Sequence, residues 1–330
     1  MAPIFSMEIT DFKKEITQVN ITNHCIWGGC SAKMRSKVVL GSRKSLKYFD
    51  KEADSDINKI QSKVNDSNLE MKYFDYNPYK LFVSYRNKVV DCYPRNRIET
   101  SRSCLSKIMN TPFEINGEKR KWIITAKSIR KESIHLYYEE TKKTDNKTLT
   151  EKYELLKNHF FVKIPISHYR KVKTIFSEVF IENRQINVDG HEVIFCTEIP
   201  GIVSDKEIQN IQELRSAEHV YLDIFKSGEF TKEVIDYNPI WWSKATLINA
   251  KQCIIAAYDY DNDCIEDIIK FDIDKFEDKS SYENLWSPTA AWNFLSDFLR
   301  FVKDSVNSVS EDIKDKCEVA GEVKPMSPKN

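Results

Sequence analysis

The chain has 330 residues, 41% of them hydrophobic and 12% aromatic, so it can bury a substantial core and is not expected to be disordered as a whole. Lys and Arg total 50, as do Asp and Glu, so the sequence gives no support to nucleic-acid binding through overall basicity. The longest strongly apolar run, Cys253–Tyr258, is too short for a membrane helix, and the first thirty residues lack the apolar stretch of a signal peptide. We therefore expect an intracellular protein that binds no membrane.

Three stretches of the N-terminal half carry a recognisable pattern. Residues 50–70 are polar and charged, which is typical of a solvated helix or loop. Residues 121–140 contain two β-rich runs separated by a charged turn and predict a hairpin. Apolar residues recur four, three and four positions apart over 149–160, which predicts a helix, and a second helix is expected around 172–179.

The C-terminal half is richer in predicted strands. Ser287 and Pro288 predict the start of a helix there, because Ser caps a helix and Pro suits its first position. Another helix is expected over 241–250. The runs typical of strands are 191–199, 220–225, 253–260 and 264–273.

These elements predict an α+β fold: a single domain with two mainly antiparallel mixed β-sheets and helices packed outside. We expect this domain to cover residues 35–310, after an N-terminal segment, 1–34, and before a disordered tail, 311–330. The tryptophans expected in its core, rather than on a base-stacking surface, are Trp241, Trp242 and Trp292.

Taken alone, the sequence carries only weak chemical motifs. With 8 glycines in 330 residues it has no Gly-rich phosphate loop. The acidic run Asp259–Asp267 lacks the Gly and terminal Glu of an EF-hand loop, so a solvated turn is a better interpretation than a calcium site. The 8 cysteines form no CxxC pair, which favours reduced thiols.

Four segments, in this order, resemble segments of the DXO family of decapping exoribonucleases. TSRSCLSKIMNTPFE (100–114) resembles the stretch that carries an active-site Arg and ends in a TPYE-like tetrad. YLDIFKS (221–227) resembles a YVELKTS strand, and WWSKATLINAKQCIIAAY (241–258) resembles a WWAQSFL helix with the VVAGF strand that follows it. WSPTAAWNFLSDFLRFV (286–302) resembles a WNP…NF…FL helix. The resemblance implies a DXO-like fold.

The resemblance also implies a function in mRNA quality control, in the nucleus or the cytoplasm. Family members hydrolyse the 5′ ends of incompletely or unusually capped RNA and degrade RNA from that end. In that family two divalent metals, Mg or Mn, are held by carboxylates on adjacent strands, where they activate water and neutralise the scissile phosphate. A Lys and a Gln position the phosphate, and an Arg reaches further along the RNA.

Only part of this site matches when the family motifs are placed on the sequence. Arg102 matches the family Arg, Glu198 matches the first carboxylate of a GEVD strand, and Asp223 matches the Glu of the ELK tripeptide on a shorter side chain. The other two ligand carboxylates are replaced by Val162 and Pro200. A Pro there also removes a backbone donor from the strand.

The two residues that would position the phosphate are also replaced, by Phe225 for the Lys and by Lys244 for the Gln. Lys226 is not expected to substitute, because adjacent strand residues face opposite sides. Two lost carboxylates and one added cation remove roughly three charges that favour metal, each worth about a few kcal/mol at an effective dielectric near 20. We therefore expect Lys244 to occupy the metal space and to pair with Glu198, Asp223 or both.

These matches favour a catalytically degenerate protein, with no cofactor, that binds RNA 5′ ends or a protein partner. Arg102 and Lys244 would contact the RNA, although Arg102 is equally suited to pair with a buried carboxylate. Two alternatives remain open. One is an active hydrolase with a rearranged site, in which Glu198 and Asp223 bind Mg or Mn. The other is a pure protein-interaction scaffold with no affinity for RNA.

Overall fold

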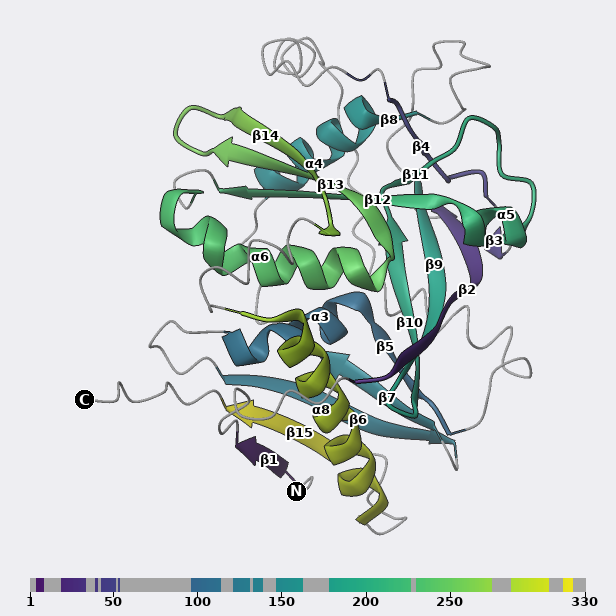
Figure 1. Ribbon diagram of the computed structural model, residues 1–330, viewed down its shortest axis with the longest axis vertical. Helices are drawn as coiled ribbons and strands as arrows, with labels where there is room; N and C mark the ends of the chain where they lie inside the picture. The colour runs from purple at the N-terminus through teal and green to yellow at the C-terminus, as the bar shows by residue number, and fades with distance from the viewer. Residues whose placement is uncertain are drawn as a thin grey trace.

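The chain forms two mixed β-sheets and the helices that pack on them, as shown by a computed structural model (Figure 1). The residues that the structure describes are 4–8, 19–33, 39–40, 43–51, 53, 96–113, 121–130, 133–138, 147–162, 178–226, 230–274, 286–308 and 317–322.

Among the described residues the larger sheet has nine strands, and it pairs a strand near the start of the chain with one near its end. Its order is β1 (Ile4–Glu8), β15 (Cys317–Glu322), β6 (Lys121–Arg130), β7 (Ser133–Tyr138), β5 (Ile98–Ser101), β10 (His191–Ile199), β9 (Glu178–Val188), β2 (Ile21–Lys33) and β3 (Val39–Leu40). The turn between β9 and β10 is Asp189-Gly190, with φ values of 50° and 82°. Two left-handed residues match the twist of a two-residue hairpin, which explains the Gly at this point.

The smaller sheet has six strands, in the order β14 (Cys264–Asp272), β13 (Ala250–Asp259), β12 (Glu218–Lys226), β11 (Gly201–Val203), β4 (Tyr48–Phe49) and β8 (Phe161–Val162). The short strand β11 pairs with β12 only over residues 218–220. From Tyr221 onward, no described strand pairs with that edge of β12. This free edge is where the predicted site residues gather.

The chain passes from the larger sheet to the smaller one at Pro200. Ile199 ends β10 and Gly201 begins β11, so Pro200 lies between two strands of different sheets. Pro has no backbone N–H to give to a ladder, and a junction between sheets does not require one. Gly201 leaves room for the ring of Phe161, which a Cβ atom at this position would strike.

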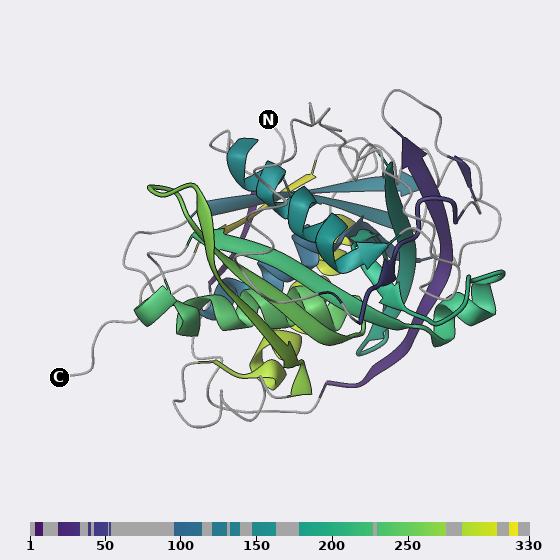
Figure 2. The same ribbon diagram turned by 90° about the horizontal axis from the view of Figure 1, so that it is seen from above.

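Three helices, α3 (Arg102–Asn110), α6 (Phe230–Leu247) and α8 (Pro288–Ser308), share one hydrophobic core with residues from both sheets. In Figure 1, α6 and α3 are stacked between β12 and the β5–β7 pair. Helix α4 (Lys147–Phe160) lies on the other face of the smaller sheet, where Leu156 and Phe160 pack with alternate residues of β12 (Figure 2). A short helix, α5 (Ile211–Ser216), and a 3-10 turn (Thr111–Phe113) complete the described elements.

The predicted α+β architecture of two mixed, mainly antiparallel sheets is confirmed. The predicted hairpin is β6–β7, the helix over 149–160 is α4, the helix over 241–250 lies in the end of α6, and Ser287-Pro288 begins α8. The four strands predicted in the C-terminal half are β10, β12, β13 and β14. Trp241, Trp242 and Trp292 are buried, as expected. In the part of the chain with a described structure, no helix is long and apolar enough to cross a membrane.

Three features differ from the prediction. The larger sheet takes in β1 and β2 from the N-terminal segment and β15 from the tail that was predicted to be disordered, so its edges lie beyond residues 35 and 310. Helices were expected outside the sheets, whereas α3, α6 and α8 pack in the core that the two sheets share. A helix was predicted around 172–179, but Glu178 and Val179 begin strand β9, and residues 172–177 lie outside the described part. Nearly all of residues 50–70 also lie outside it.

Candidate functional site

Four of the predicted site residues come from four different elements around the free edge of β12. Arg102 is the first residue of α3, Glu198 is next to the end of β10, Asp223 lies in β12, and Lys244 lies in α6. Two tyrosines connect them electrostatically. Tyr153 of α4 interacts with Glu198 and Arg102, and Tyr221 of β12 interacts with Asp223 and Arg102. The fold therefore brings both predicted carboxylates and Arg102 into one neighbourhood.

Asp223 is fully engaged by protein groups. Lys244 Nζ lies 3.1 Å from its Oδ2 atom, and the Tyr221 hydroxyl donates to the same oxygen. The backbone N–H of Ile224 donates to Oδ1 at 2.9 Å. Burial by itself raises the pKa of Asp223, but Lys244, Tyr221 and this N–H more than offset it, so the pKa lies below its ordinary value. Asp223 is thus an ionised carboxylate whose counterion is an ammonium group.

Glu198 has a different counterion from the one expected. Its carboxylate forms an ion pair with Lys157 of α4, whose ammonium group also lies 3.2 Å from Glu154. The Lys157 side chain is only 2% exposed. Burial lowers the pKa of Lys157, but the two carboxylates outweigh it, so the pKa lies above its ordinary value and the residue is charged. The prediction that Lys244 pairs with Glu198, Asp223 or both therefore holds for Asp223.

Arg102 lies over an aromatic ring. Its guanidinium carbon is 5.7 Å from the centroid of the Tyr221 ring, within the range of a cation–π contact. Its Nη1 atom is buried and has no hydrogen-bond partner among the described residues. No described carboxylate accepts a hydrogen bond from Arg102, so pairing with a buried carboxylate is not what the structure shows. The guanidinium therefore keeps at least one donor, Nη1, that no described group accepts.

The positions predicted to replace the family's ligand and phosphate-binding residues belong to the core. Val162 is partly buried in β8 and packs on the shared core, and Pro200 is buried at the crossing between the sheets. Phe225 is 6% exposed, and its ring centroid lies 5.1 Å from that of Trp241. Lys226 reaches the other face of β12, where its Nζ lies 5.4 Å from the Tyr260 ring centroid. Lys226 therefore does not replace the missing phosphate-binding Lys, as the strand alternation predicted.

Lys157 and Glu154 are members of the site that the sequence prediction missed. They lie three residues apart in α4 and have the spacing of an ordinary helix-surface pair. Glu198, with which Lys157 forms its ion pair in the site, is 41 residues away in the sequence. The only available signal was the position of Lys157, one residue before the segment matched to the GYKFE motif.

The residues present do not fit a pair of divalent metals. Glu154, Glu198 and Asp223 supply three negative charges, and Lys157, Lys244 and Arg102 supply three positive charges, so the neighbourhood is neutral. Hard divalent cations require an excess of anionic oxygen ligands. Among the described residues, no group of three His, Cys, Asp or Glu side chains is placed to hold a metal. The donor set here is that of a closed ion-pair cluster.

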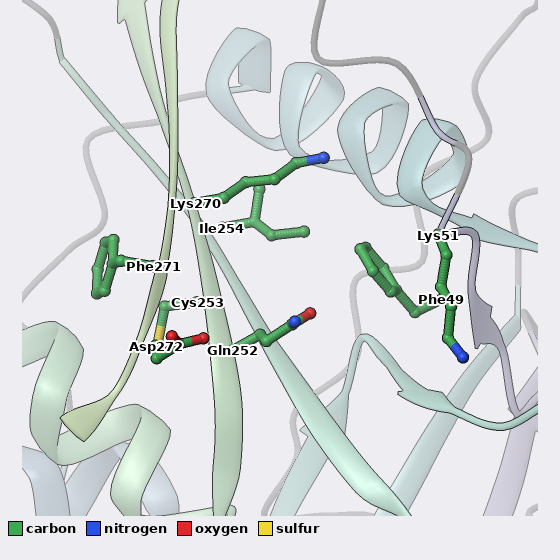
Figure 3. A pocket seen from close by; sticks show the side chains of 8 residues that line it. All are labelled: Phe49, Lys51, Gln252, Cys253, Ile254, Lys270, Phe271 and Asp272. Atoms are coloured by element: carbon green, nitrogen blue, oxygen red, sulfur yellow. The ribbon is translucent and has the colours of Figure 1, made fainter. Parts of the chain in front are cut away.

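A separate cavity of about 350 Å³ opens on the smaller sheet, between β4 and the β13–β14 pair (Figure 3). The side chains of Phe49 and Gln252 point into it, while Cys253 and Phe271 point away. Lys270 Nζ lies 4.8 Å from the Phe160 ring centroid, beside α4. None of the predicted site residues lines this cavity, so it does not belong to the site on β12.

No protein-family model matches the sequence, and no curated protein matches it either. Solved structures match over nearly the whole chain. Rai1 from S. pombe, in complex with 3′-FADP, is 14% identical with a TM-score of 0.70, covering 96% of this chain and 95% of that chain. Rai1 from Candida albicans, in complex with pU5 and Mn²⁺, is 13% identical with a TM-score of 0.67, covering 98% of this chain and 90% of that chain. K. lactis Dxo1, in complex with manganese, is 12% identical with a TM-score of 0.57, covering 94% and 92%.

These matches establish the fold. The chain has the fold of the Rai1 and Dxo1 proteins, and the DXO-like fold predicted from four short segments is confirmed. The low identities agree with a divergent sequence.

Proposed function

We propose that the chain is a catalytically degenerate member of the DXO family that binds RNA 5′ ends without efficient hydrolysis. The fold supports the family, and the Candida albicans and S. pombe Rai1 structures hold pU5 and 3′-FADP. One observation carries the loss of catalysis: both carboxylates that survive from the family site are ion-paired with lysines, Glu198 with Lys157 and Asp223 with Lys244.

The energetic argument is one of competition. A metal that approached Asp223 or Glu198 would have to displace an ammonium group from each carboxylate. A unit charge pair at 4 Å contributes about 4 kcal/mol at an effective dielectric of 20, so each displacement costs about that much. The two carboxylates that could offset this cost are absent, because Val162 and Pro200 stand in their places. Cation binding, and hydrolysis that depends on it, are therefore disfavoured.

Two cations remain able to contact a phosphate. Arg102 has a buried Nη1 donor with no partner, and its planar guanidinium suits two phosphate oxygens at once. The Lys244 side chain is 31% exposed, and Asp223 uses one of its three ammonium donors. We therefore assign Arg102 and Lys244 as the RNA contacts, with no metal between them and the phosphate.

The test pairs a hydrolysis assay with a binding assay. RNAs that end in a triphosphate, a cap or NAD are incubated with magnesium or manganese, and S. pombe Rai1 serves as the active reference. We expect no turnover, together with salt-dependent binding of a 5′-monophosphorylated RNA in EDTA. Robust turnover that Glu198→Ala abolishes would replace this proposal with the active-hydrolase alternative. A complete lack of RNA affinity would replace it with a protein-interaction scaffold.

A further inference from the structure

Tyr221 connects the Lys244–Asp223 ion pair to Arg102. Tyr221 and Asp223 are two residues apart in β12, so their side chains lie on the same face of the strand. The Tyr221 hydroxyl donates to Asp223 Oδ2, the same oxygen that lies 3.1 Å from Lys244 Nζ. The Arg102 guanidinium carbon lies over the Tyr221 ring, 5.7 Å from its centroid. One side chain, 2% exposed, thus meets the ion pair with its hydroxyl and Arg102 with its ring.

The hydroxyl end of Tyr221 is bound to a carboxylate that is itself held at two points. Asp223 accepts the backbone N–H of Ile224 at 2.9 Å and pairs with Lys244, so both β12 and α6 hold it. A tyrosine side chain has only two torsions, and here its tip is tied to that carboxylate. The ring is therefore a rigid support for whatever lies on its face.

A ring holds an arginine differently from a carboxylate. Arg184 of β9 provides the contrast: its Nε donates to Glu182 Oε2 at 2.8 Å, and Glu182 Oε1 lies 2.9 Å from His219 Nε2. Arg102 instead meets an aromatic face, which attracts its charge without taking up its N–H donors as a carboxylate does. Its buried Nη1 has no acceptor among the described residues. The contact thus holds the guanidinium in place and keeps this donor available to an oxyanion.

We infer that Tyr221 is a positioning residue for Arg102, anchored by the Lys244–Asp223 ion pair. An arginine side chain loses rotamer freedom when it binds a phosphate, and a ring that already orders the guanidinium lowers this cost. The ion pair that disfavours a metal therefore also supports the RNA contact. This inference rests on the proposed function, because it relates the arrangement of Arg102 to RNA binding. Tyr221 acts through Arg102 and is not itself an RNA contact.

The contact between Arg102 and the ring is measured without RNA. In protein labelled with ¹³C at arginine, Arg102→Lys identifies the Arg102 signals in NMR spectra. Protons above an aromatic ring are shifted upfield by its ring current. We expect the Arg102 δ protons upfield of their ordinary position in the parent and in Tyr221→Phe, and at that position in Tyr221→Leu. An unshifted Arg102 signal in the parent would overturn the inference, whatever the RNA assays show.

The positioning role is measured by the affinity for 5′-monophosphorylated RNA. Tyr221→Leu removes the ring, and we expect it to weaken binding about fivefold at low salt. Tyr221→Phe keeps the ring but loses its anchor, so a loss of about twofold is expected. In the Arg102→Ala background the Leu and Phe variants should bind equally, because the ring then has no guanidinium to position. A Phe variant as weak as the Leu variant, or a difference that persists without Arg102, would overturn the role.

Tyr258 of β13 provides a matched control for the loss of a buried tyrosine. It is 1% exposed, Lys152 Nζ lies 5.6 Å from its ring centroid, and its hydroxyl donates to Asp263. Tyr258 belongs to the core cluster on the other face of the smaller sheet. We expect Tyr258→Leu to lower stability as Tyr221→Leu does, but to bind RNA within about twofold of the parent.

Equal losses of RNA affinity in the two Leu variants would attribute the effect to general destabilisation and overturn the role of Tyr221. If the parent itself binds no RNA, the proposed function fails. The Arg102 signals then still decide whether the ring holds the guanidinium.

Discussion

The ammonium group of Lys244 lies 3.1 Å from the Asp223 carboxylate, on a helix that faces the strand from inside the core shared by the two sheets. The sequence resemblance matches Lys244 to a neutral Gln of the DXO family and Asp223 to one of its metal-binding Glu residues. The Lys244–Asp223 ion pair therefore gives a partly buried carboxylate a counterion from within the protein. The following variants test this ion pair and the corresponding pair between Glu198 and Lys157.

Removing Lys244 should destabilise the protein. Lys244→Gln leaves Asp223 ionised and partly buried without its counterion, at an expected cost of about 1–3 kcal/mol in the free energy of unfolding. Urea denaturation measures this cost. Lys226→Gln is the control, because Lys226 is exposed on the opposite face of β12, and we expect a change within about 0.5 kcal/mol. Equal effects of the two variants would contradict the internal-counterion interpretation.

Lys157 should matter more than Lys244, because its side chain is 2% exposed and it serves two carboxylates. We expect Lys157→Met to cost about 3–5 kcal/mol, since it leaves Glu198 and Glu154 without their shared cation. Adding Glu198→Gln removes one of the two stranded charges and should recover part of the loss. A double-mutant cycle in urea tests this, and simple additivity of the two changes would show that the pair is not coupled.

The wild-type protein should take up no manganese, whereas a variant with the oxygens restored should. Val162→Glu, Pro200→Asp and Lys244→Gln together return two carboxylates and remove one ammonium group. We expect isothermal titration calorimetry to detect manganese binding to the triple variant alone. The single Lys244→Gln variant is the control for the effect of charge removal. Tight uptake by the unaltered chain would refute the proposed loss of metal binding.

Arg102 should contribute to RNA affinity and to its dependence on salt. We expect Arg102→Ala to weaken binding of a 5′-monophosphorylated RNA about tenfold and to reduce the slope of log K against log salt by about 0.7–1. Arg102→Lys keeps the charge but loses the planar guanidinium, so an intermediate loss is expected. Fluorescence anisotropy over a salt series gives both quantities. An unchanged slope would mean that Arg102 contacts no phosphate.

Acid should unfold the protein through Asp223 and Glu182. Burial raises the pKa of each, but their cationic partners outweigh it, so both lie below the ordinary values of 3.8 and 4.5. A carboxyl with a lowered folded pKa stabilises the fold above its unfolded pKa and loses this contribution as pH falls. We expect the free energy of unfolding to change little from pH 7 to about 5 and to fall below about pH 4. Asp223→Asn should show a shallower fall, and a stability that rises on acidification would contradict the assignment.

The elements that local spacing defines were predictable from the sequence, and those that depend on distant partners were not. Helix α8 was predictable because Ser287, Pro288 and the periodic apolar residues that follow them are close together in the sequence. Strand β15 was not, because its place in the sheet comes from pairing with β1 and β6, more than a hundred residues away. A short strand with charged residues, CEVAGE, has no pattern of its own that separates it from a disordered tail.

The candidate site divides in the same way. Motif spacing placed Arg102, Glu198, Asp223 and Lys244, because short segments in order carry that information. It did not give the counterion of Glu198, which comes from a helix whose lysine looks like any surface lysine until the fold buries it.

The position of Pro200 limits what a single substitution can add to the site. An Asp at that position would add a carboxylate and a backbone N–H at a buried junction between the two sheets, next to Gly201, where the Phe161 ring leaves no room for a Cβ atom. The two lysine counterions would also still be in place. A carboxylate added at this position alone would therefore meet two occupied ion pairs, Glu198–Lys157 and Asp223–Lys244, and would add negative charge to the cluster without an open place for a cation.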